Sequence, residues 1–137
     1  MFILVVEDDP LIGLGLEATL LGAAHTVCGP VMTARGAVAL VERGKDLPDL
    51  ALLDINLADG SGAGIDLARQ LKRHWHIPSL FLSGQPIEAH ANRDAALGYL
   101  GKPYTPEAIL ASIALIAQRD RNGSFEPGRI PPGLELF

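Results

Sequence analysis

The stretch FILVVEDDP at residues 2–10 is an apolar run that ends in three acids and a proline. A continuous β-rich run of this kind is typical of a strand covered on both faces, as in a parallel sheet. Asp9 is predicted to be the N-cap of a following helix, with Pro10 at the first helical position, where its missing N–H costs nothing. The stretch therefore predicts a strand, a charged turn and a helix, the first βα unit of an α/β fold.

Short apolar runs alternate with longer segments of helical period along the rest of the chain. Further strands are predicted at residues 26–28, 50–53, 79–82 and 98–101. A helix is expected after each strand, and Thr105 and Pro106 open the last one. We therefore predict one α/β domain at residues 1–121, a doubly wound parallel sheet of five βα units. Residues 122–137 are rich in proline and glycine and are interpreted as an extended tail with no output domain.

Composition excludes several classes of protein. The 137 residues suit one domain, and 48% hydrophobic residues exclude a disordered chain. Sixteen acids against eleven bases give a net charge of −5, which excludes a basic nucleic-acid footprint. The single cysteine, Cys28, suits a reducing compartment. No basic segment precedes the first apolar run, and no run is long enough to cross a bilayer. We therefore expect a cytoplasmic protein with no membrane insertion.

Polar side chains interrupt the apolar strands at one kind of position. Glu7 and Asp8 follow the first predicted strand, and Asp54 ends the third. Ser83 ends the fourth strand, and Lys102 follows the fifth. Right-handed crossovers bring the carboxyl ends of parallel strands to one edge of the sheet, where open α/β sheets build their sites. The five side chains are therefore expected to meet in one crevice.

The chemistry of that crevice favours phosphoryl transfer. Three carboxylates close together repel, so holding them ionised needs a cation, and hard oxygen ligands suit Mg²⁺. Glu7 and Asp8 are predicted to hold the metal together with Asp54, and the Asn56 backbone carbonyl completes its shell. Lys102 supplies the remaining positive charge. Asp54, on the central strand, is then placed as the nucleophile that attacks phosphorus in line.

These motifs resemble the receiver domain of two-component response regulators. The resemblance covers residues 2–119 and lies in VEDD at 6–9, LLDINL at 52–57, SG at 83–84 and YLGKP at 99–103. It implies a flavodoxin-like (βα)5 sheet with strand order 2-1-3-4-5. It also implies that Asp54 accepts a phosphoryl group from the phosphohistidine of a sensor kinase or a phosphotransfer protein.

The family resemblance assigns further roles. The residue matching Lys102 contacts the phosphate, the hydroxyl matching Ser83 moves to it, and the aromatic matching Tyr99 turns inward behind that hydroxyl. Asn56 and Gln85 occupy positions that influence hydrolysis of the acyl phosphate, and their amides can orient water. We therefore expect a phosphate lifetime nearer minutes than days. Beyond its own phosphorylation and dephosphorylation, the chain is expected to be no enzyme.

Three rival functions have less support in the sequence. A phosphatase of small molecules would form a phosphoenzyme on Asp54, but such enzymes want a second acid two residues later, where this chain has Asn56. A flavin-binding module would need a Ser/Thr/Gly phosphate loop after the first strand, where this chain has three acids. A scaffold receiver that is not phosphorylated gains no support, since the site residues are present. Whether the chain is a relay intermediate or an endpoint effector stays open.

The last helix and the tail raise a question about surfaces. Ile109, Ile113 and Ile116 share one face of the last helix, and Leu110 and Leu115 lie outside it. If these two leucines form an exposed second stripe, it would bind a target or a second copy of the chain. A helix covered by the tail is an equal alternative. The tail is apolar enough to dock, with Phe125, Ile130, Leu134, Leu136 and Phe137. The helix after Ser83 is expected to be short or irregular, which argues against a standard dimer there.

Overall fold

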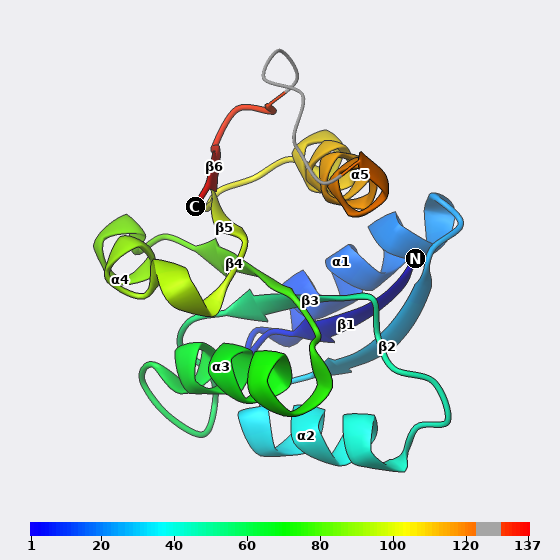
Figure 1. Cartoon of the computed structure of the whole chain (residues 1–137), viewed down its shortest axis with the longest axis vertical. Coiled ribbons are helices and arrows are strands. Elements are labelled where there is room, and N and C mark those ends of the chain that lie inside the picture. Colours follow the sequence, from blue (N-terminus) through cyan, green and yellow to red (C-terminus); the bar gives the residue numbers. More distant parts are fainter. Residues whose placement is uncertain (123–129) are drawn as a thin grey trace.

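The structure is a computed structural model that describes residues 1–122 and 130–137. Strands and helices alternate along the chain (Figure 1). The strands are β1 (Phe2–Val6), β2 (Thr26–Val31), β3 (Leu50–Asp54), β4 (Ser79–Ser83), β5 (Gly98–Gly101) and β6 (Leu134–Leu136). The helices are α1 (Pro10–Gly22), α2 (Ala34–Arg43), α3 (Ala63–Trp75), α4 (Pro86–Ala91) and α5 (Pro106–Asn122), with a 3₁₀ turn at Arg93–Ala95.

The strands form one sheet in the order β2-β1-β3-β4-β5-β6. The first five are parallel, and their order confirms the predicted flavodoxin-like fold. Helices α1 and α5 cover one face of the sheet, and α2 and α3 cover the other (Figure 1). The carboxyl ends of the parallel strands therefore lie along one edge, as expected for this topology.

The apolar core has two layers, one on each face of the sheet. In β1, Leu4 and Val6 pack toward the α2–α3 layer, while Ile3 and Val5 pack toward the α1–α5 layer. Both faces of the central strands are buried, and this is why their sequences are continuous apolar runs and do not alternate with polar residues.

Strand β2 is longer than predicted. The predicted range is 26–28, but the strand continues through Gly29 and Pro30 to Val31. β2 lies at the edge of the sheet, where the N–H that proline lacks is not needed by a neighbouring strand. The register with β1 also shifts between Leu4 and Val6, which accommodates the irregular pair.

The C-terminal segment contributes a strand that was not predicted from the sequence. β6 pairs antiparallel with β5 and adds a sixth strand to the edge of the sheet. Residues 130–137 are therefore not simply an extended tail, and Leu134 belongs to the α1–α5 core layer. The predicted boundary at residue 121 falls in the last turn of α5, and Phe125 lies outside the described residues.

Of the two alternatives left open for the last helix, the structure contradicts the exposed second stripe. Leu115 is buried, and Leu110 is partly buried against the same core layer. Over residues 106–119, α5 presents no exposed large hydrophobic side chain. The reason is that α5 packs on the sheet between α1 and the C-terminal segment, so that more than one stripe of the helix is covered.

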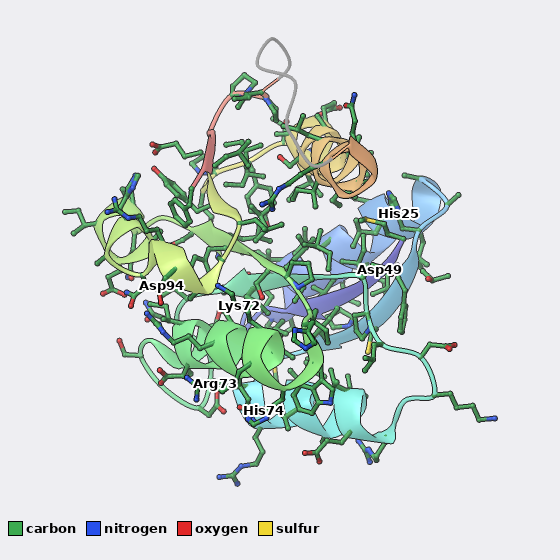
Figure 2. All side chains as sticks on the ribbon, in the orientation of Figure 1. His25, Asp49, Lys72, Arg73, His74 and Asp94 are labelled. Carbon is green, nitrogen blue, oxygen red and sulfur yellow. The ribbon has the colours of Figure 1, made fainter. Side chains whose placement is uncertain are left out.

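Helix α4 is short and irregular, as predicted, and the segment after it is held by α3. The Lys72 ammonium group donates to the backbone carbonyl of Asp94 at 2.7 Å. Arg69 forms an ion pair with the Asp94 carboxylate at 2.9 Å. Figure 2 shows Lys72 and Asp94 where the 3₁₀ turn meets α3. In the described part of the chain, no helix combines the length and apolar character that a membrane span requires.

Candidate functional site

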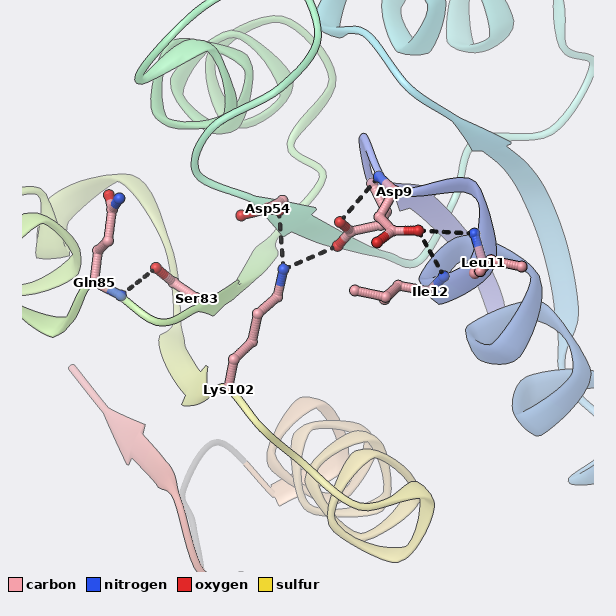
Figure 3. Close-up of polar contacts among 8 residues, drawn as sticks. Asp9, Leu11, Ile12, Asp54, Ser83, Gln85 and Lys102 are labelled. Carbon is pink, nitrogen blue, oxygen red and sulfur yellow. Dashed lines mark hydrogen bonds and ion pairs between the residues drawn. The ribbon is translucent and has the colours of Figure 1, made fainter.

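Asp54 and Lys102 meet at the carboxyl edge of the sheet, as the strand pattern predicted. Asp54 is the last residue of β3, and Lys102 directly follows β5. The Lys102 ammonium nitrogen lies 3.0 Å from Asp54 Oδ2 (Figure 3). It also lies 3.3 Å from Glu7 Oε2, at the turn after β1. Three strands thus bring one cation and two carboxylates together.

The acids form a cluster that fits a hard divalent cation. Glu7, Asp8 and Asp54 each offer a carboxylate oxygen, and these oxygens lie within 4.8 Å of one another. Glu7 is buried, Asp54 is half-buried and Asp8 is exposed. Mg²⁺ favours carboxylate oxygens and keeps several waters, so a cluster with one solvent-facing member suits it. The residues predicted to hold the metal therefore fit Mg²⁺, while the role of the Asn56 carbonyl stays a prediction.

The electrostatics show why a cation is needed. The pKa of Glu7 is raised from 4.5 to about 7, chiefly by burial and then by the charge of Asp54, while Lys102 acts to lower it. Burial alone would lower the pKa of Lys102, but its hydrogen bond to Asp54 and the nearby carboxylates raise it overall, so the ammonium group stays charged. One lysine therefore balances the acids only in part, and an added divalent cation would offset the remaining repulsion.

Asp9 has a structural role. Its Oδ1 accepts hydrogen bonds from the backbone N–H of Leu11 at 2.9 Å and of Ile12 at 3.4 Å (Figure 3). These bonds cap the first turn of α1, as predicted. The Asp9 N–H in turn donates to Glu7 Oε1 at 3.3 Å, so the cap helps to position the buried acid.

Ser83 faces away from the acids in this conformation. Its hydroxyl oxygen accepts a hydrogen bond from the Gln85 backbone N–H at 2.8 Å (Figure 3). Ser83 is buried, and the backbone N–H of Lys102 donates to its carbonyl at 2.9 Å. The hydroxyl is thus beside the site and engaged with the start of α4.

The Asn56 side chain is bound to the loop that follows β3. Its Oδ1 accepts hydrogen bonds from the Gly62 N–H at 2.9 Å and from the Ser61 hydroxyl at 3.3 Å. A bridge between Leu57 and Gly60 closes the same loop. Asn56 therefore positions the loop next to Asp54, and only its NH₂ group is left to contact a water near the phosphoryl site.

Two residues near the site were missed from the sequence. Gly64 begins α3 against the end of β3, where any Cβ would overlap the carbonyl oxygen of Asp54. The Tyr104 hydroxyl is buried without a hydrogen-bond partner among the described residues. Burial and the charge of Glu7 raise its pKa to about 12. The place of Gly64 depends on how closely two backbones approach, which no local pattern reveals.

Tyr99 contacts the C-terminal segment. Its hydroxyl donates to Glu135 Oε2 on β6, and this hydrogen bond raises the pKa of Tyr99 and lowers that of Glu135. The ring lies edge-on to His90 of α4, with centroids 5.4 Å apart, and 6.1 Å from Phe137. The alternation Leu134-Glu135-Leu136 after a Pro-Gly turn is a local signal of this strand, although three residues are too few to establish a period of two.

Comparison with known proteins gives consistent matches. The model of the response regulator receiver domain matches residues 3–114. The phyllosphere-induced regulator PhyR of Methylorubrum extorquens is 35% identical over 113 residues, which are 82% of this chain and 42% of that protein. The chain spans about half the length of the curated relatives it matches.

Solved structures give the same result. A CheY-like response regulator receiver domain protein from Methanospirillum hungatei aligns with a TM-score of 0.77 at 25% identity, over 90% of this chain and 98% of that one. A mutant of the anti-anti-sigma factor PhyR from Bartonella quintana aligns with a TM-score of 0.74 at 28% identity, over 88% of this chain and 50% of that one. The family match ends within α5, so β6 lies beyond it.

Proposed function

The chain belongs to the response regulator receiver domain family, and on that premise we propose that Asp54 accepts a phosphoryl group from a histidine of a sensor kinase or phosphotransfer protein. The proposal includes a Mg²⁺ requirement and a cytoplasmic setting, which suits the free thiol of Cys28. The observation that carries it is the 3.0 Å contact between Lys102 and Asp54 beside a three-carboxylate cluster.

The transfer needs no side chain of this protein beyond those of the site. A carboxylate oxygen of Asp54 forms the bond to phosphorus while the bond between phosphorus and the donor imidazole breaks. The bonding pair goes to the imidazole nitrogen, so an acyl phosphate and a free histidine result. The Lys102 ammonium group offsets the charge on the transferred oxygens. Mg²⁺, held by Glu7, Asp8 and Asp54, would supply further positive charge at these oxygens.

Phosphorylation changes the charge beside two side chains that can move. An aspartyl phosphate adds about −1.5 to −2 charges and three acceptor oxygens. The Ser83 hydroxyl now accepts from the Gln85 N–H, and we propose that it turns to donate to a phosphate oxygen. Tyr99 then moves toward the space that the Ser83 loop vacates. The surface around β5 would carry the signal.

A phosphohistidine donor must contact the rim of the site in order to reach Asp54. That rim carries two large exposed apolar side chains, Leu11 at the start of α1 (80% exposed) and Ile87 at the start of α4 (84% exposed). They follow β1 and β4, the strands on either side of β3. We propose that the donor protein packs on these two side chains, since their burial would favour association.

Hydrolysis of small phosphorylated substrates gains no support from the site. Asn56 stands where a phosphoenzyme phosphatase would place its second acid, and its amide oxygen is bound to the loop. We therefore propose that the chain acts on no separate substrate and catalyses only its own phosphorylation and dephosphorylation.

The test is incubation of the full chain with a small phosphodonor and Mg²⁺, followed by mass measurement of the intact protein. Wild type should gain one phosphoryl group, and Asp54→Asn should gain none. Asp46→Asn, an exposed acid distant from the site, should behave as wild type. Equal gain by wild type and Asp54→Asn would refute the proposal. Candidate histidine kinases and phosphotransfer proteins would then distinguish a relay intermediate from an endpoint effector.

A further inference from the structure

We propose that the edge of β5 is an interaction surface for an extended peptide segment, and that residues 134–137 occupy it until phosphorylation displaces them. This inference rests on the proposed function of Asp54. Before phosphorylation, the chain's own C-terminal strand occupies the edge of β5. The partner that replaces this strand is an extended segment of similar chemistry.

The strand that covers this edge is short and lightly held. β6 comprises Leu134–Leu136 and pairs with Gly98, Tyr99 and Leu100 of β5. Backbone bonds also close both ends: the Gly101 N–H donates to the Gly133 carbonyl at 2.9 Å, and the Phe137 N–H donates to the Leu97 carbonyl at 2.9 Å. A three-residue edge strand opens far more readily than the buried strands of the same sheet.

The side chains of β6 hold the residue proposed to switch. Glu135 accepts a hydrogen bond from the Tyr99 hydroxyl and lies 3.3 Å from His90 Nε2. The Phe137 ring packs near Tyr99 and His90, with its centroid 5.6 Å from that of His90. Movement of Tyr99 toward Ser83 would break its bond to Glu135, so the strand loses its main side-chain contact when the switch operates.

The strand is also close to the phosphoryl site itself. A hollow of about 440 Å³ is lined both by Ser83 and Lys102 and by Gly133 and Glu135. Gly101, whose N–H donates to the Gly133 carbonyl, directly precedes Lys102. The Lys102 N–H donates to the Ser83 carbonyl. A shift of the Ser83 loop therefore reaches β6 through two consecutive backbone hydrogen bonds.

The edge of β5 is shaped to accept a strand. Gly98 has no side chain, and a Cβ there would overlap the carbonyl oxygen of Glu135. Leu134 and Leu136 join the core layer on the α5 side, while the intervening Glu135 faces Tyr99 and His90. The surface thus fits a segment that alternates apolar, acidic and apolar residues, as in strand addition at a sheet edge.

Hydrogen exchange tests the displacement in the full chain. Phosphorylation with a small phosphodonor and Mg²⁺ should speed exchange of the amides at residues 98–101 and 134–137 by about tenfold or more, the effect of losing one hydrogen bond to a charged group. Gly98→Ala should produce the same change without phosphorylation, while Gly15→Ala, with open space around it, should not. Asp54→Asn should show no response to the phosphodonor.

Mass measurement on the same samples separates the two proposals. If wild type gains no phosphoryl group, the proposed function fails. If it gains one and exchange at residues 98–101 and 134–137 is unchanged, the displaceable strand is refuted while the function stands.

A fluorescent peptide of sequence IPPGLELF, residues 130–137, tests whether the edge accepts a segment from outside. It should bind the unphosphorylated Glu135→Lys chain at least about tenfold more tightly than unphosphorylated wild type, since the variant's own strand competes less while the edge of β5 is unchanged. The matched control is a peptide with lysine in place of the glutamate, which should bind more weakly. Equal binding to wild type and Glu135→Lys, or none to either, would refute the interaction surface.

Discussion

Glu7 Oε2 and the Lys102 ammonium nitrogen lie 3.3 Å apart, although 95 positions separate the two residues. Glu7 is only 1% exposed, and its pKa is raised from 4.5 to about 7, chiefly by burial and then by Asp54. The contact therefore belongs to an acid that the metal-free fold holds at a cost. Strongly shifted pKa values are typical of functional sites, so a buried carboxylate that lowers the stability of the fold indicates a chemical role.

The raised pKa of Glu7 predicts how stability depends on pH. Between pH 4.5 and 7 the native chain binds a proton at Glu7 that the unfolded chain releases, so this residue lowers the free energy of unfolding as pH rises through the window. Glu7→Gln should raise the unfolding free energy at pH 8 by about 1–3 kcal/mol and change it little at pH 4.

Urea unfolding of the metal-free protein in a chelator provides the measurement. The difference between variant and wild type isolates Glu7 from other groups, such as His25, whose pKa is lowered by burial. Glu42→Gln, on the exposed side of α2, is the matched control and should show no such difference. A variant less stable than wild type at pH 8 would contradict the argument.

Mg²⁺ should stabilise the folded chain through Asp8 and not through Asp9. A ligand at about 100 times its dissociation constant adds roughly 2.7 kcal/mol to the unfolding free energy, so Mg²⁺ should raise the melting temperature of wild type. Asp8→Asn should lose most of this increase. Asp9→Asn keeps a good N-cap for α1 and should retain it, because Asp9 is bound to Leu11 and Ile12. Equal loss in both variants would contradict the assignment of the metal ligands.

Two glycines in helices should respond to alanine in opposite directions. A Cβ at Gly64 would overlap the Asp54 carbonyl, so Gly64→Ala should lower the unfolding free energy by about 1–3 kcal/mol and slow phosphorylation. Gly15 has open space around it on α1, so Gly15→Ala should raise stability by about 0.5–1 kcal/mol. Thermal unfolding of the two variants checks both signs. A loss of stability in Gly15→Ala would show that α1 needs a glycine there.

The site was predictable because each of its members ends or follows an apolar run. Asp54 and Lys102 are marked by local sequence, and the parallel topology alone brings them to one edge. The conformation of Ser83 was not predictable, because its hydroxyl chooses between the Gln85 N–H and a phosphate that binds later. Position follows from the strand pattern, whereas side-chain partners depend on the state of the site.

The sixth strand escaped prediction for a different reason. Three residues are too few to establish a period of two, and the strand has little stability without its neighbour. Its place is set by features of another segment, namely the missing side chain of Gly98 and the hydroxyl of Tyr99. The same holds for β2, where only the position at the sheet edge allows Pro30 within a strand.

The lifetime of the acyl phosphate should depend on the amides of Gln85 and Asn56. The Gln85 side chain has no hydrogen bond to any described residue, so it is free to orient water, while Asn56 has only its NH₂ group available. Gln85→Ala should lengthen the lifetime by roughly threefold to tenfold, the effect of losing one water-mediated hydrogen bond.

Asn56→Ala also removes the bond to the Gly62 N–H, so its effect on the lifetime should come with faster amide exchange in the loop at residues 57–62. Gln70→Ala, an exposed amide on α3, is the control for both variants. Loss of the phosphoryl group is followed by mass after the phosphodonor is removed. Unchanged lifetimes in Gln85→Ala and Asn56→Ala would mean that other groups orient the hydrolytic water.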